Sequence, residues 1–124
     1  MPDHLDLGKR GESLAAELLR LKGYRILAEN YRIQRAEIDL IAQQGEVMVF
    51  VEVKTRSTAR FGPPELSVDR KKRAILTDAA GYYCYEQEHE GEMRFDIISI
   101  VYESVKVTIT HHEDAFFGVK RGFQ

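Results

Sequence analysis

Apolar residues recur every three or four positions near the start of the chain and again in its middle. Between residues 7 and 21 they form one stripe, with charged side chains opposite, and Gly23 follows. This period predicts an amphipathic helix, and a glycine after the last turn is typical of a helix end. A second helix is predicted from an N-cap at Ser67 to about Glu86. Its inner face is predicted to contain Val68, Ile75, Leu76, Ala79, Ala80 and Tyr83.

Shorter segments, in which polar and apolar residues alternate more closely, predict β-strands. Five strands are expected, at residues 24–31, 36–42, 46–55, 93–102 and 105–111. Together with the two helices they give the order α-β-β-β-α-β-β. This order predicts an α/β fold with a central mixed β-sheet flanked by helices.

The length and composition of the chain limit the classes of protein to which it can belong. Its 124 residues predict one domain over residues 1–112, followed by a C-terminal tail at 113–124 that is partly disordered and has a helical turn at 114–117. No apolar run approaches the roughly 20 residues of a membrane span, and the start lacks the features of a signal peptide. Cys84 is the only cysteine, which excludes an internal disulfide and favours a reducing, cytoplasmic location.

The third predicted strand ends in charged residues, although most of it is typical of a buried strand. Residues 47, 49, 51 and 53 are all valines and share one face, which we expect to pack on a helix. Glu52 and Lys54 share the opposite face. On the preceding strand, regular alternation places Asp39 with Glu37 and Ile41, opposite residues 38, 40 and 42. A hairpin between the two strands is expected to bring Asp39 beside Glu52, with Lys54 next to both.

Two neighbouring carboxylates repel each other unless a cation lies between them. Oxygen ligands of this kind suit Mg²⁺ or Mn²⁺, so Asp39 and Glu52 are predicted metal ligands. A metal bound there can neutralise the charge of a phosphodiester and activate water for its hydrolysis. Lys54 is predicted to stabilise the transition state or to orient the water, and its carboxylate neighbours are expected to favour its charged form.

Six segments together show a resemblance to a known family. They are residues 8–12 (GKRGE), 23–27 (GYRIL), 30–32 (NYR), 37–41 (EIDLI), 50–56 (FVEVKTR) and 94–96 (RFD). An Asp followed on the next strand by Glu-x-Lys resembles the PD-(D/E)xK nuclease superfamily. The wider pattern resembles the YraN-like family, which consists of small, largely uncharacterised bacterial proteins similar to archaeal Holliday-junction resolvases. One departure is Ala36, where that family usually has glycine before Glu-Ile-Asp.

The resemblance implies a restriction-endonuclease-like fold and a metal-dependent nuclease that acts on structured or branched DNA. It places Asp39, Glu52 and Lys54 at the catalytic positions and Glu12 near the metal as a further ligand. Lys71 resembles a lysine of the family's second helix and is expected to contact nucleic acid. The loop at 56–66, with Arg56 and Arg60, is expected to flank the DNA. Junction-cutting relatives act as symmetric pairs, which implies a homodimer.

Several alternatives stay open at this point. Asp39 and Lys54 can form a purely structural ion pair, and Glu12 can serve only as a helix-edge salt bridge. The chain can therefore also be a non-catalytic module that binds nucleic acid on a nuclease-like fold. A third alternative is an interaction subunit of a DNA repair or recombination complex. The charge does not decide between them, because the net charge of −2 combines +3 over residues 1–73 with −5 over residues 74–124.

Overall fold

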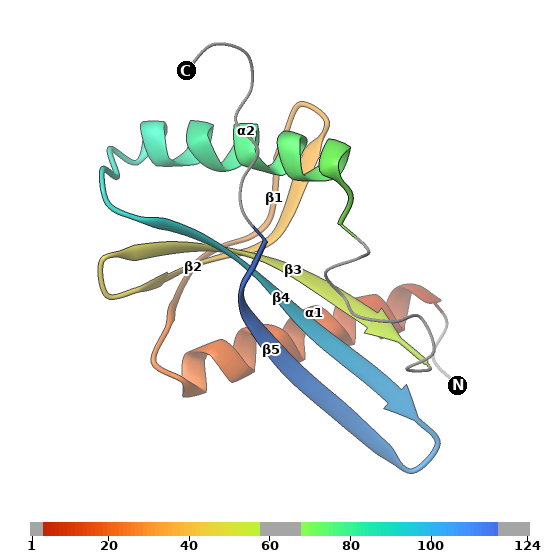
Figure 1. Ribbon diagram of the computed structural model, residues 1–124. Helices are drawn as coiled ribbons and strands as arrows, with labels where there is room; N and C mark the ends of the chain where they lie inside the picture. Colours follow the sequence, from red (N-terminus) through yellow and green to blue (C-terminus); the bar gives the residue numbers. More distant parts are fainter. Residues whose placement is uncertain (1–3, 58–67, 117–124) are drawn as a thin grey trace.

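The computed structural model describes residues 4–57 and 68–116 of the chain (Figure 1). The order α-β-β-β-α-β-β, which the sequence predicts, is confirmed. Neither described helix is long and apolar enough to cross a membrane. The elements are α1 (His4–Leu21), β1 (Arg25–Ile33), β2 (Ala36–Gln44), β3 (Val47–Arg56), α2 (Arg70–Glu86), β4 (Met93–Glu103) and β5 (Lys106–Phe116).

The five strands form one mixed sheet in the order β1-β2-β3-β4-β5. Strands β3 and β4 are parallel, whereas the other neighbouring pairs are antiparallel. Parallel neighbours need a crossover connection, which α2 supplies between β3 and β4. The two helices lie on opposite faces of the sheet (Figure 1). The expected mixed sheet flanked by helices is therefore confirmed.

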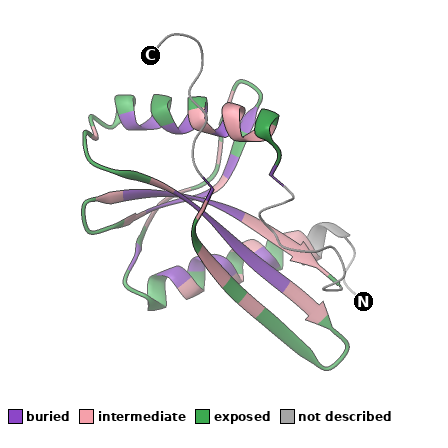
Figure 2. Cartoon of the chain, viewed as in Figure 1, coloured by how far each residue is buried: buried purple, intermediate pink, exposed green. Residues whose placement is uncertain are grey.

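Each face of the sheet has its own hydrophobic core. On the α1 side, Val49 and Val51 of β3 are fully buried with Ala15 and Leu19 of the helix. On the α2 side, Phe50 of β3 packs in a cluster with residues of α2. The alternation predicted for β3 is thus confirmed. Buried residues follow the central strands and the inner sides of the helices (Figure 2).

Strand β2 does not alternate regularly, and the sequence prediction for it is wrong at its centre. Ile38 packs on the α2 side together with Ile41, whereas Leu40 packs on the α1 side. Pairing with β3 runs from Gln44 only as far as Leu40, opposite Val51. The break in the pattern therefore falls at Asp39, the residue between the two regular parts of the strand.

The second helix begins later than its sequence suggests. Its N-cap is Asp69, not Ser67, because the Asp69 carboxylate accepts a hydrogen bond of 2.8 Å from the backbone N–H of Lys72. Ser67 itself lies outside the described residues. The buried face of α2 is otherwise as predicted for Leu76, Ala79, Ala80 and Tyr83.

The last strand is longer than predicted, and residues 114–116 continue β5 where a helical turn was expected. Asp96, which is 0% exposed, holds this part of the strand in place. Its carboxylate accepts two hydrogen bonds of 2.9 Å from Arg94 and one of 2.9 Å from the Asp114 N–H, and His111 Nε2 lies 2.7 Å away. Burial alone would raise the pKa of Asp96, but these bonds lower it. Residues 117–124 lie outside the described part of the chain.

Replacing Val51 with alanine should lower the free energy of unfolding by about 1–3 kcal/mol, because the side chain is 0% exposed and its loss leaves a cavity. Urea denaturation measures the change. Val107→Ala is the matched control: Val107 is 48% exposed, so its effect should stay within about 0.5 kcal/mol. Equal stability of the Val51 variant and the wild type would show that the face assignment of β3 is wrong.

Candidate functional site

The candidate site lies where β2 separates from β3. Beyond Leu40 the two backbones no longer pair in register, and the Val53 N–H donates instead to Asp39 Oδ2 at 2.8 Å. On the other side, Asp39 lies between the β1–β2 pairs that join Glu29 to Leu40 and Tyr31 to Ile38. The carboxylate therefore replaces a backbone acceptor of the sheet, which fixes its position next to the charged end of β3.

Glu52 is the second acid of the site and is almost completely buried, at 5% exposure. Its Oε2 lies 2.7 Å from Lys72 Nζ of α2 and 3.8 Å from Lys54 Nζ of its own strand. The shorter distance makes Lys72 the main partner of Glu52. A buried carboxylate needs such a partner to stay charged. Lys72 thus links the helix to the end of β3.

The electrostatics of the site disfavour two charged acids. Burial, followed by the negative charge of Glu52, raises the pKa of Asp39 to about 7, although the bond from Val53 opposes this shift. The two carboxylates are therefore close enough for one to change the protonation of the other.

The pKa values of the two lysines of the site shift in opposite directions. Burial, and then the positive charge of Lys72, lower the pKa of Lys54. Glu52 and Asp39 favour its charged form, as expected, but burial and Lys72 outweigh them, so the net shift is downward. Burial would also lower the pKa of Lys72, but the bond to Glu52, the charge of Glu52 and the contributions of Lys54 and Asp39 together outweigh burial and raise that pKa.

Glu12 approaches the site from α1. The neighbouring Gly11 allows this approach, because a Cβ there would collide with Thr55 Oγ1 of β3. In the amide orientation that satisfies its neighbours, Asn30 donates to Glu12 Oε1 at 3.2 Å. Burial, partly opposed by this bond, raises the pKa of Glu12, and the charge of Glu12 contributes to the raised pKa of Asp39. Across residues 4–57 and 68–116, no three His, Cys, Asp or Glu side chains form a ready metal-binding group.

The residues predicted to contact nucleic acid lie in different places. Arg56 is the last residue of β3, at the same end as Lys54. Arg60 lies outside the described residues. Lys71 is exposed on the first turn of α2, and it is the next residue, Lys72, that reaches Glu52. Sequence reasoning missed Lys72, yet its spacing from Leu76, Ala79 and Tyr83 places it on the buried side of the helix.

Comparisons with known proteins give a consistent family assignment. The model of "Uncharacterised protein family UPF0102" matches residues 11–100. A UPF0102 protein of Christiangramia forsetii is 49% identical over 117 residues, which cover 94% of this chain and 98% of that protein. Another from Flavobacterium psychrophilum is 46% identical with the same coverage. One from Thermodesulfovibrio yellowstonii is 43% identical, over 91% of this chain and 97% of that protein.

A weaker likeness exists to a solved structure, that of Pyrococcus furiosus SfsA in complex with Ca²⁺. The match covers 96% of this chain and 66% of that chain, with 18% sequence identity and a TM-score of 0.40. A TM-score of this size does not establish a shared fold.

The raised pKa of Asp39 predicts how stability depends on pH. An ordinary aspartate has a pKa of 3.8, and Asp39 has one of about 7 in the fold, so the folded state retains a proton that the unfolded state releases. The free energy of unfolding should therefore fall, by about 1–4 kcal/mol, as the pH rises from about 4 to about 7 without divalent metal. Urea denaturation across this range measures the slope.

Asp39→Asn should remove most of this slope, because the amide does not titrate and still accepts the bond from Val53. Glu37→Gln is the control from the same strand and should retain the slope, since Glu37 is exposed. If the wild type were equally stable throughout the range, a raised pKa at Asp39 would be excluded.

Proposed function

This chain belongs to the uncharacterised protein family UPF0102, and we propose that it is a metal-dependent nuclease that hydrolyses phosphodiester bonds in structured or branched DNA. Membership confirms the family resemblance noticed in the sequence. The preference for branched DNA rests on the similarity of YraN-like proteins to Holliday-junction resolvases. That similarity also implies a homodimer, because cutting two strands of a junction needs two sites.

One observation is the main support for this proposal, namely the pair formed by the partly buried Asp39 and the buried Glu52. Burial, and then the charge of Glu52, raise the pKa of Asp39 to about 7, so a cation bound between the two carboxylates would favour the charged form of Asp39. Perturbed carboxylates next to lysines are typical of catalytic sites.

The chemistry of the two acids supports a divalent metal as the cofactor. Carboxylate oxygens from two neighbouring strands are hard ligands of the kind that Mg²⁺ and Mn²⁺ prefer, and we expect Asp39 and Glu52 to hold the ion. Glu12 is a third carboxylate near these two, its charge contributes to the raised pKa of Asp39, and we expect it to assist. When bound, the metal supplies charge neutralisation at the phosphate and an activated water.

The lysines have separate proposed roles. Lys54 lies on β3 two residues beyond Glu52 and is half-buried, so it can place its amino group against the scissile phosphate and stabilise developing negative charge. Lys72 keeps Glu52 paired while no metal is bound, with Nζ at 2.7 Å from Oε2.

A second candidate function is a nucleic-acid-binding module without catalysis. The observation that favours it is the same short contact between Lys72 and Glu52, because this bond already compensates one of the two acids. In that case Asp39 and Glu52 are structural and bind no ion. Metal affinity therefore separates the two candidates.

Titration with Mn²⁺ in a calorimeter should show one site in the wild type, and both Asp39→Asn and Glu52→Gln should abolish the binding. The same variants should lose cleavage in a screen of linear, nicked, flapped and four-way DNA. Glu37→Gln is the matched control, since Glu37 lies on β2 but is exposed and pairs with Arg32 at 3.7 Å. Absence of binding to the wild type at millimolar Mn²⁺ would leave only the binding module.

Lys54→Ala should reduce cleavage by roughly 10²–10³-fold, because it removes a charge from the transition state. Mn²⁺ affinity and the unfolding midpoint should change little, since Glu52 retains its contact with Lys72. Single-turnover cleavage together with calorimetry measures both quantities. Lys106→Ala, on the exposed start of β5, is the control. Cleavage by the Lys54 variant at the wild-type rate would remove this lysine from the mechanism.

A further inference from the structure

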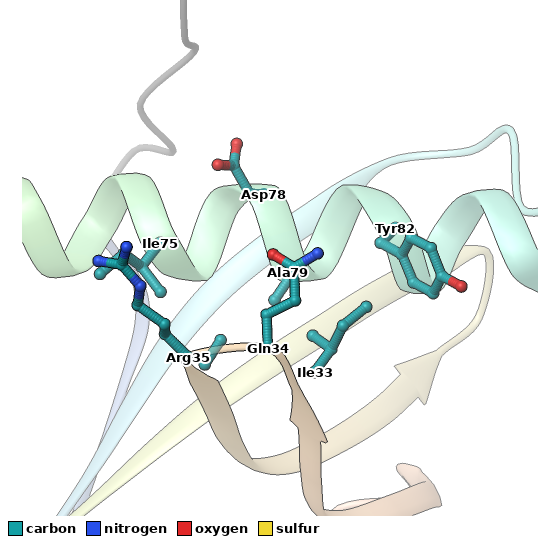
Figure 3. Close-up of a pocket in the computed structure, with 8 residues that line it drawn as sticks. Ile33, Gln34, Arg35, Ile75, Asp78, Ala79 and Tyr82 are labelled. Carbon is teal, nitrogen blue, oxygen red and sulfur yellow. The ribbon is translucent and has the colours of Figure 1, made fainter.

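A groove lies between α2 and the turn that joins β1 to β2, and no function has been assigned to it so far. Its outer part is a hollow of about 340 Å³, lined by Gln34 and Arg35 of the turn and by Ile75, Ala79 and Tyr82 of the helix, among others (Figure 3). A second hollow of about 350 Å³ adjoins it and shares Arg35 and Ile75. The two hollows form one continuous groove along α2.

The inner end of this groove reaches the candidate active site. Lys71 and Lys72 line the second hollow, and Lys72 Nζ is the group that lies 2.7 Å from Glu52. A DNA strand whose phosphate lies at Glu52 and Lys54 can therefore continue along the groove without leaving the protein surface. The groove thus extends the site toward the neighbouring nucleotides.

The groove offers cations that are available to phosphate. Arg35 and Lys71 take part in no ion pair with the described residues, in contrast to Lys72. Two acids of the lining are already engaged: Glu37 pairs with Arg32 at 3.7 Å, and Asp69 caps the helix. Arg35 and Lys71 are therefore the cations of the groove that a phosphate can contact without breaking an ion pair between described residues.

The outer end offers an aromatic surface. Tyr82 is 46% exposed and follows Ile75 and Ala79 at helical spacing, so the three side chains share one side of α2. In Figure 3 the ring lies at the opposite end of the hollow from Arg35, whereas Asp78 points away from the hollow. An exposed ring next to an apolar floor is suited to stack a nucleobase, and such stacking tolerates any base.

The size and charge of the groove favour an unpaired strand over a duplex. Lys72 and Tyr82 are ten residues apart on α2, about 15 Å of helix, which is the length of roughly four stacked nucleotides. The lining has three cations and three acids, so phosphate contacts alone give little affinity. Stacking on Tyr82 therefore has to supply the remaining affinity, and stacking requires a base that is not paired.

We propose that this groove binds the unpaired DNA strand next to the scissile phosphate, with Arg35 at a phosphate and Tyr82 against a base. This inference rests on the proposed function and narrows its substrate to DNA with unpaired nucleotides beside the cleavage point. Flaps, gaps and junction arms that open at the site belong to this class.

Binding is tested in metal-free buffer, so that no cleavage occurs, with a fluorescent single-stranded oligodeoxythymidylate and a duplex of equal length. Tyr82→Ala should weaken binding of the single strand by about fivefold to a hundredfold, and Tyr82→Phe should change it by no more than about twofold. Tyr85→Ala is the matched control, since Tyr85 is 82% exposed on the same helix but does not line the groove. Thermal unfolding verifies that each variant is folded.

Arg35→Ala should lower the slope of log affinity against log salt by about 0.7, the contribution of one phosphate on a single strand. Arg25→Ala, an exposed cation at the other end of β1, should leave the slope unchanged. The inference is overturned if the wild type does not bind the oligonucleotide, if Tyr82→Ala and Tyr85→Ala act alike, or if the duplex binds equally well.

The outcome for the groove is separable from that for the proposed function. If the protein binds the single strand through Tyr82 but binds no metal and cuts no DNA, the proposed role of the groove is supported and the proposed nuclease activity is contradicted. If the Tyr82→Ala variant cleaves gapped and flapped DNA with unchanged kcat/KM, the proposed nuclease activity is supported and the proposed role of the groove is overturned.

Discussion

The hydrogen bond from the Val53 N–H to the Asp39 carboxylate determines how the site is built. At this point β2 stops pairing with β3, and a side-chain oxygen replaces the missing backbone acceptor. The exchange leaves no backbone donor of Val53 unpaired, and it keeps a carboxylate at partial burial beside Glu52. Without this bond, Asp39 could turn toward solvent and its pKa would return to its ordinary range. The same local irregularity explains why Ile38 and Leu40 pack on opposite sides of the sheet.

The two acids at this point are compensated by positive charge to different degrees. Lys72 and Lys54 compensate Glu52, whereas the hydrogen bond that Asp39 accepts within the described residues comes from a backbone N–H, and burial with the charge of Glu52 raises the pKa of Asp39 to about 7. Glu12, from the opposite helix, adds further negative potential. Because α2 is the crossover between the two parallel strands, its packing positions Lys72 over the end of β3. One helix therefore supplies both the cation at Glu52 and one wall of the groove that ends at Tyr82.

Much of the fold follows from local patterns. The period of the apolar residues predicts both helices, the five strands and the inward valines of β3, because each depends on neighbours in the chain. The approach of Asp39 to Glu52 follows from a short hairpin, which is also local. The start of α2 and the end of β5 differ from prediction for a physical reason. The Asp69 carboxylate accepts a hydrogen bond from the backbone N–H of Lys72. The Asp96 carboxylate accepts one from the backbone N–H of Asp114, which is 18 residues away.

The sequence alone therefore determined the order of the elements, the mixed sheet and the acids and lysine of the site, since alternation and helical spacing act over a few residues. Only the tertiary structure decided that Lys72, among four consecutive cations on α2, bonds to Glu52, because helical spacing places Lys72 on the buried side but does not show which strand residue it meets. It also decided that Asp39 bonds to Val53, and that the turn after β1 and Tyr82 line the same hollow. Such contacts join residues far apart in the chain, and no local period encodes them.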